Sequence, residues 1–125
     1  MDNANPEPIT ILLIEDEALI RMATAAMLED AGYRVVEAMN ADEALVTLGE
    51  GQQIDIVITD VQMPGRLDGL ELVEIITEKY PHILSLVTSG RASLREARDC
   101  GAKKFLTKPY TATAIQSAVE AVLAA

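Results

Sequence analysis

The sequence predicts an α/β fold in which helices cover both faces of one parallel, five-stranded sheet, and three observations carry this prediction. Short β-rich runs alternate five times with segments of helical periodicity. The first run, residues 9–14, is almost continuously apolar, which is typical of a central strand buried on both faces. Aromatic residues make up only 3% of the chain, so aliphatic side chains must fill the core. Right-handed crossovers between such units favour a doubly wound (βα)5 sheet.

The composition indicates one soluble domain, because 125 residues of which 50% are hydrophobic can bury a single core. The net charge of −10 argues against direct nucleic-acid binding, which requires clustered Lys and Arg. No apolar run approaches the roughly 20 residues that span a bilayer, and the polar residues 1–8 do not form a signal peptide. Cys100 is the single cysteine, which favours a free thiol in a reducing compartment. We therefore expect a flexible tail at 1–8, a domain at 9–125 and a cytoplasmic location.

The first two strand–helix units have recognisable ends. After the strand at 9–14, a helical spacing places several apolar side chains on one face of a helix: Leu19, Met22, Ala23, Ala26 and Met27. Gly32 is a suitable stop for this helix. The second strand is expected at 33–38, and Asn40, with Glu43 three positions later, predicts the capped start of the next helix. Gly49 and Gly51 end that helix.

The remaining three units follow the same pattern. The third strand, 54–60, ends at an aspartate, and a loop at 61–68 leads to a helix at 69–79 that Pro81 terminates. The fourth strand is expected at 83–88, and a capping box at 93–96 starts a short helix that Gly101 ends. The fifth strand is expected at 103–107. The last helix begins at Thr111 and has one apolar stripe: Ile115, Ala118, Val119, Val122 and Leu123.

Chemically active side chains follow four of the five strands. In a doubly wound sheet, sites form beyond the carboxyl ends of the strands, at the switch in strand order. Each of these residues alone has an ordinary explanation, since acids suit helix N-termini and Asp is common in turns. Their joint appearance at one sheet edge favours a common site. The residues are Glu15, Asp16 and Glu17 after the first strand, Asp60 after the third, Thr88 and Ser89 after the fourth, and Lys108 and Pro109 after the fifth.

This set of residues predicts metal-assisted phosphoryl transfer. Glu15, Asp16 and Asp60 would converge, and two carboxylates ~5 Å apart repel by about 3 kcal/mol at an effective dielectric constant near 20. A hard divalent cation such as Mg²⁺ relieves that repulsion and still keeps room for phosphate oxygens. Asp60 can then act as the nucleophile, because carboxylates form aspartyl phosphates. Lys108, the metal and the Thr88 hydroxyl would each contact one equatorial phosphoryl oxygen.

Four segments resemble the receiver domain of bacterial response regulators in two-component signalling. They are LIEDE (13–17), ITDVQMPG (58–65), VTSG (87–90) and FLTKPY (105–110), and the resemblance covers about residues 9–125. It implies a flavodoxin-like three-layer sandwich with strand order 2-1-3-4-5. It also implies that Asp60 is the phospho-acceptor, that Thr88 and Lys108 contact the phosphoryl group, and that Phe105 is the switch aromatic that rotates when Thr88 moves.

The resemblance further implies a metal site and a set of partners. Glu15 and Asp16 match the acidic pair, and Gln62 stands where relatives supply a backbone carbonyl to Mg²⁺, for which Mn²⁺ can substitute. Relatives have a cis bond before Pro109. The resemblance implies a signalling protein rather than an enzyme, although one that assists its own phosphorylation and dephosphorylation. A sensor histidine kinase or histidine phosphotransfer protein would be the donor. A downstream protein target would read the surface of the fourth helix, fifth strand and fifth helix, with the chain a stand-alone monomer or a phosphorylation-dependent dimer.

The sequence departs from this family pattern in three places. The acidic pair is Glu-Asp where many relatives have Asp-Asp. The loop at 63–69 is one residue longer than in chemotaxis-type receivers. The stretch between Thr88 and Lys108 is shorter, which predicts a reduced fourth helix. These departures affect the expected output surface rather than the expected phosphorylation chemistry.

Three alternative functions share parts of this pattern. An Mg²⁺-dependent phosphohydrolase with an aspartyl nucleophile would need a second Asp as general acid at the position of Gln62. A flavodoxin-like flavin carrier would need a neutral phosphate loop where Glu15, Asp16 and Glu17 stand. A receiver-like interaction module without phosphorylation would have little need for the full set of site residues. His82 is interpreted as a turn residue, and Arg91, Arg95, Lys103 and Lys104 as solvated charges with a partner contact as the alternative.

Overall fold

A computed structural model describes residues 7–90 and 100–124 of the chain. Five parallel strands form one sheet in the order β2-β1-β3-β4-β5, which confirms the predicted doubly wound topology. The strands are β1 (Thr10–Ile14), β2 (Arg34–Ala38), β3 (Ile56–Asp60), β4 (Leu84–Ser89) and β5 (Lys104–Thr107).

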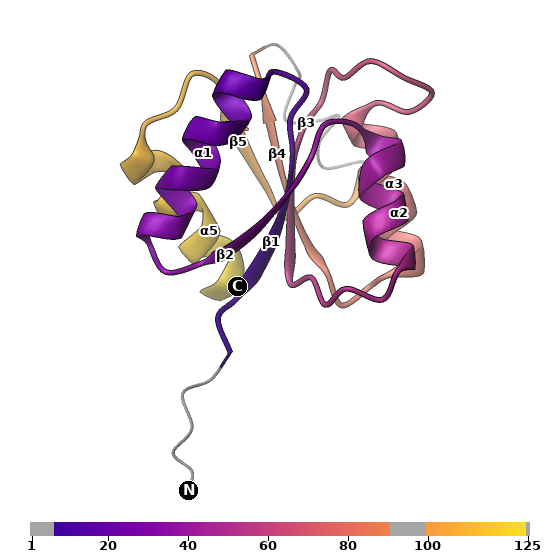
Figure 1. The fold of residues 1–125 in the computed structure, drawn as a ribbon, viewed down its shortest axis with the longest axis horizontal. Helices are drawn as coiled ribbons and strands as arrows, with labels where there is room; N and C mark the ends of the chain where they lie inside the picture. Colours follow the sequence, from indigo (N-terminus) through magenta and orange to yellow (C-terminus); the bar gives the residue numbers. More distant parts are fainter. Residues whose placement is uncertain (1–6, 91–99, 125) are drawn as a thin grey trace, which may run out of the picture.

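Helices cover the two faces of the sheet in pairs. Figure 1 shows α1 (Ala18–Asp30) and α5 (Ala112–Ala124) on one face, and α2 (Ala41–Gly49) and α3 (Gly69–Lys79) on the other. The chain is therefore a three-layer sandwich. The short helix that the sequence predicts after Ser93 lies outside the described residues.

The side chains of β1 supply both halves of the core. Ile11 and Leu13 pack with α1 and α5, whereas Leu12 and Ile14 pack with α2 and α3. All five β1 residues are buried, as expected for a central strand covered on both faces. This alternation directs every second residue of β1 and β3 toward the layer that contains α1 and α5.

The apolar face predicted for α1 is wrong. The helix buries Thr24, Ala25 and Leu28, whereas Leu19 and Met22 are 84% and 60% exposed. Small and apolar residues occupy most positions of this helix, so hydrophobic spacing alone did not separate the two faces. The stripe predicted for α5 is confirmed at Ile115, Ala118, Val119 and Val122, while Leu123 is 37% exposed.

The predicted cap of α2 is confirmed, the capping box predicted at 93–96 lies outside the described residues, and α3 has a capping box that the sequence analysis did not predict. The Asn40 side chain accepts a hydrogen bond from the Glu43 backbone N–H (2.8 Å) at the start of α2. Asp68 caps α3 in a reciprocal capping box with Glu71. α2 ends at Gly49, and Gly32 and Gly51 adopt positive φ just beyond α1 and α2.

Strand limits differ from the predicted ones by one or two residues. β3 begins at Ile56 rather than Ile54, and the side chain of the preceding Asp55 accepts a hydrogen bond from the Thr10 N–H (2.9 Å). Within the part of the chain that the structure describes, no helix has the length and apolar character needed to cross a membrane.

Candidate functional site

Strand register brings the predicted site residues to one edge of the sheet. Ile14, which precedes Glu15, is paired with Thr59, which precedes Asp60. On the other side of β3, Asp60 is paired directly with Thr88 of β4. Ser89 is paired with Thr107, so Lys108 follows at the same edge. Four segments that are distant in sequence thus end side by side.

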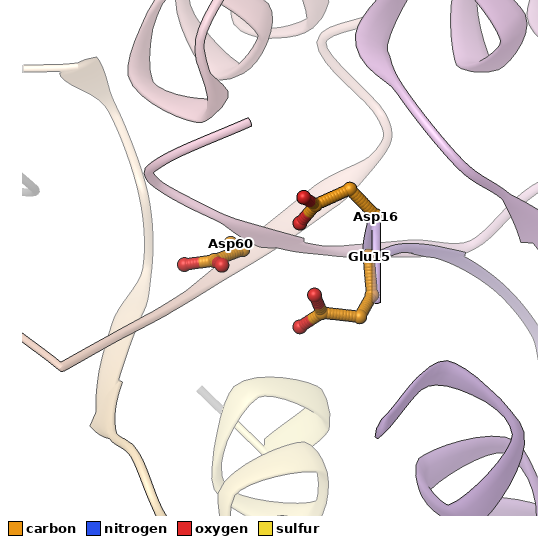
Figure 2. A group of neighbouring side chains, drawn as sticks. All are labelled: Glu15, Asp16 and Asp60. Carbon is orange, nitrogen blue, oxygen red and sulfur yellow. The ribbon is translucent and has the colours of Figure 1, made fainter. Parts of the chain in front are cut away.

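Three carboxylates converge at this edge. Glu15, Asp16 and Asp60 each offer an oxygen atom within 4.8 Å of the other two. Figure 2 shows Glu15 and Asp16 leaving the end of β1 in succession, with Asp60 on the neighbouring strand. Glu15 is 3% and Asp60 is 9% exposed, whereas Asp16 is exposed to solvent. This set of hard oxygen ligands, open on one side, fits a divalent cation.

Lys108 bridges two of the three carboxylates. Its Nζ lies 2.7 Å from Glu15 Oε1 and 3.0 Å from Asp60 Oδ2. Burial alone would lower the pKa of the Lys108 ammonium, but the hydrogen bonds to Glu15 and Asp60 outweigh burial and raise the pKa above its ordinary value. Lys108 is therefore a permanent positive charge beside Asp60. The Lys108–Pro109 peptide bond is cis, as the resemblance implied.

Burial dominates the protonation of Glu15. Desolvation raises the pKa of its carboxyl above the ordinary value, while hydrogen bonds from Lys108 and the Glu17 backbone N–H act in the opposite direction. A nearby cation would favour the ionised form of this carboxyl.

Thr88 lies on β4 beside Asp60, and Phe105 lies on β5, the next strand of the sheet. Thr88 is 2% exposed, and its hydroxyl lies 3.5 Å from the Thr59 carbonyl oxygen, a long and weak hydrogen bond that leaves the hydroxyl free to reorient. Phe105 is half-buried and packs against a small cluster between β4 and α3: Val61, Val73, Val87 and Cys100. Gln62 is exposed in the loop two residues beyond Asp60.

The comparisons with known proteins identify the family. The family model described as "Response regulator receiver domain" matches residues 11–120. The chain belongs to this family. Among curated relatives, the transcriptional regulatory protein PdtaR of Mycobacterium tuberculosis is 38% identical over 115 residues, covering 90% of this chain and 56% of PdtaR. The chain thus spans about half the length of that relative.

Other receiver-family proteins extend the comparison to kinases and to solved structures. The sensor kinase CckA of Brucella abortus is 36% identical over 118 residues, covering 91% of this chain and 12% of CckA. A CheY-like receiver domain protein from Methanospirillum hungatei superposes with a TM-score of 0.87 at 26% identity, covering 94% of this chain and 95% of that structure. Receiver domains are signalling modules, and the acidic cluster here is consistent with phospho-accepting two-component signalling.

Two further side chains near the carboxylate cluster make contacts that sequence reasoning missed. Arg21 of α1 donates from Nη1 to the Glu15 carbonyl oxygen (2.8 Å) and pairs through Nε with Glu37 Oε1 (3.1 Å). Tyr110, just after the cis bond, shares a hydrogen bond with Thr24 of α1 (2.9 Å). Arg21 and Thr24 both lie on the side of α1 opposite to the apolar face that the sequence analysis predicts.

Proposed function

We propose that this chain is a phospho-accepting receiver in which Asp60 takes a phosphoryl group in a Mg²⁺-dependent reaction. The observation that carries the proposal is the convergence of Glu15, Asp16 and Asp60 within 4.8 Å, with Lys108 Nζ 3.0 Å from Asp60 Oδ2. The donor is the phosphohistidine of a sensor kinase or of a histidine phosphotransfer protein. An Asp60 carboxylate oxygen attacks the phosphorus, the bond from phosphorus to the donor imidazole breaks, and its electron pair returns to the imidazole nitrogen.

The surrounding residues have separate roles in this proposal. Glu15, Asp16, Asp60 and the Gln62 backbone carbonyl would hold Mg²⁺, or Mn²⁺ in its place, and the cation would supply positive charge beside the phosphoryl oxygens. Lys108 can exchange one of its two carboxylate contacts for a phosphoryl oxygen, because its ammonium is already beside Asp60. Thr88, paired with Asp60 across the strands, supplies a hydroxyl to another oxygen. The reaction thus transfers a group to the protein itself, which makes the chain a signalling partner rather than a turnover enzyme.

Phosphorylation would change the surface formed by β5, α5 and the segment between β4 and β5. Movement of the Thr88 hydroxyl toward the phosphoryl group would leave space beside β5, and the half-buried Phe105 could rotate into it. Changing the ratio of active to inactive conformers from 1:99 to 99:1 requires about 5.5 kcal/mol of differential stabilisation of the active conformer. A downstream protein would bind this surface, either on the monomeric chain or on a phosphorylation-dependent dimer of the chain.

Acetyl phosphate provides a direct test without knowledge of the kinase. We expect intact-mass spectrometry to show one phosphoryl group on the wild type with Mg²⁺ and none after chelation with EDTA. Asp60→Asn should incorporate none, while Asp55→Asn, which alters the other aspartate near β3, should behave like the wild type. Undiminished incorporation by Asp60→Asn would overturn the assignment.

The proposed rotation of Phe105 has a test of its own. Phe105 is the single phenylalanine, so labelled phenylalanine gives one ring signal in a nuclear magnetic resonance spectrum. An unchanged signal after addition of Mg²⁺ and beryllofluoride would rule out the rotation.

A further inference from the structure

Gly69, the first residue of α3, lies against the backbone of Asp60. A Cβ atom at this position would overlap the Asp60 carbonyl oxygen and would lie 2.8 Å from the Asp60 carbonyl carbon and 3.0 Å from the Val61 Cα. Its backbone does not have positive φ, so packing rather than conformation requires a glycine here. In contrast, Gly49 has ordinary φ and open space around the position of an added Cβ.

Hydrogen bonds hold the two peptide units that follow Asp60 from opposite sides. The Val61 N–H donates to the Thr88 carbonyl oxygen on β4 (3.0 Å). The Val61 carbonyl oxygen accepts from the Gly69 N–H (2.8 Å), which closes the base of the loop at 61–68. These two peptide units connect Asp60 to Gln62. The start of α3 therefore helps to define where the acceptor carboxylate and the Gln62 carbonyl lie.

We infer that Gly69 is a positioning residue for phosphoryl transfer, acting through the Asp60 and Gln62 backbone rather than by touching the phosphoryl group. This inference rests on the proposed function. A methyl group at Gly69 must displace either the start of α3 or the peptide after Asp60, because the overlapping atoms are all backbone. Displacement of that peptide moves the Asp60 carboxylate relative to Glu15 and Lys108. A misplacement of about 1 Å can cost about 100-fold in rate.

The stability of α3 can be varied separately from this close contact. Asp68 accepts from the Glu71 N–H (2.9 Å), and the Asp68 N–H donates to the Glu71 carboxylate (3.0 Å). Glu71 is exposed and lies outside the phosphorylation site. Glu71→Ala therefore weakens the start of the same helix without adding an atom beside Asp60. Gly49→Ala adds the same methyl group as Gly69→Ala, but into open space.

The experiment measures the rate of phosphorylation by acetyl phosphate as a function of Mg²⁺ concentration for the full chain and these variants. We expect Gly69→Ala to react at least tenfold more slowly than the wild type at saturating Mg²⁺, and its Mg²⁺ midpoint to rise. Glu71→Ala should have a lower urea midpoint but a rate and Mg²⁺ midpoint within twofold of the wild type. Gly49→Ala should also react within twofold of the wild type.

The outcomes separate the inference from the proposed function. A folded Gly69→Ala that reacts within twofold of the wild type overturns the inference, as does an equal loss of rate in Glu71→Ala. If Gly69→Ala is unfolded by circular dichroism, it is remade in the Gly49→Ala background, whose extra alanine favours the helix. A chain that stays unfolded there also overturns the inference, because Gly69 would then serve the whole fold. A wild type that accepts no phosphate contradicts the proposed function instead, and the inference about Gly69 falls with it.

Discussion

An aspartate lies at each end of β3, and the structure uses the two carboxylates in opposite ways. At the amino end, Asp55 Oδ2 accepts a hydrogen bond from the Thr10 N–H (2.9 Å), and the Asp55 backbone bonds to Thr10 and Leu84. At the carboxyl end, Asp60 contacts Lys108 Nζ (3.0 Å), which Asp60 shares with Glu15. The first carboxylate is bound to a backbone N–H of β1 and to no other group of the described residues, whereas the second belongs to a cluster with more acids than lysines.

The difference shows how one residue type serves stability at one edge and chemistry at the other. A carboxylate bound to a backbone N–H satisfies a donor that the folded chain must pair. A carboxylate crowded by others is held in place at an electrostatic cost, which a cation and a phosphoryl group can relieve. The amino-terminal edge should therefore govern folding and the carboxyl-terminal edge should govern activity. Three substitutions can break or sharpen this distinction.

The largest effect on stability is expected for Asp55→Ala. Removal of the carboxylate leaves the N–H of Thr10, a residue only 7% exposed, without its acceptor, and such a loss costs ~1–3 kcal/mol. Urea denaturation should show this decrease in the free energy of unfolding. At a temperature where the variant is folded, its rate of phosphorylation by acetyl phosphate should equal that of the wild type. A slower reaction of the folded variant would contradict the separation between the two edges.

The opposite sign is expected for Asp16→Asn when divalent cations are absent. Asp16 makes no side-chain hydrogen bond or ion pair to another residue of 7–90 or 100–124, and its carboxylate lies within 4.8 Å of Glu15 and Asp60. Removal of its charge relieves repulsion, and solvent exposure limits the expected gain to about 1 kcal/mol.

Urea denaturation in EDTA measures the effect of Asp16→Asn, and Glu74→Gln on the exposed side of α3 is the control. The control should change the free energy of unfolding by less than about 0.5 kcal/mol. Added Mg²⁺ should stabilise the wild type more than Asp16→Asn, because the variant has lost a ligand. An Asp16→Asn variant less stable than the wild type in EDTA would show that the cluster is not under electrostatic repulsion.

Sequence reasoning located this edge of the sheet but missed the groups that support it. Glu15, Asp60 and Lys108 could be placed together because parallel strand topology alone brings strand ends to one edge. Arg21 could not be placed, because α1 has apolar residues on both faces and its buried face includes Thr24, whose hydroxyl meets Tyr110 from the other end of the chain. The close contact at Gly69 was also hidden, since it depends on where α3 packs against β3. Local patterns thus predicted elements and strand ends, whereas contacts between distant elements required the structure.

The smallest of the three effects is expected for Glu15, because burial and Lys108 act against each other on its carboxyl. Burial is the larger influence and raises the pKa above its ordinary value. An acid whose pKa is higher in the folded state than in the unfolded state loses stability as pH rises from its unfolded pKa through its folded pKa.

Without divalent cations, the wild type should therefore lose stability relative to Glu15→Gln as pH rises from about 4 toward 7. Urea denaturation of both proteins across this range measures the difference in the free energy of unfolding. Glu74→Gln, which removes an exposed charge, is the control, and its difference from the wild type should stay nearly constant with pH. A wild type that gains stability relative to Glu15→Gln over this range would mean that the 2.7 Å contact with Lys108 outweighs burial. In that case Glu15 would resemble Asp55, as a carboxylate already satisfied by its partner, and the need for a cation at this edge would rest on Asp16 and Asp60.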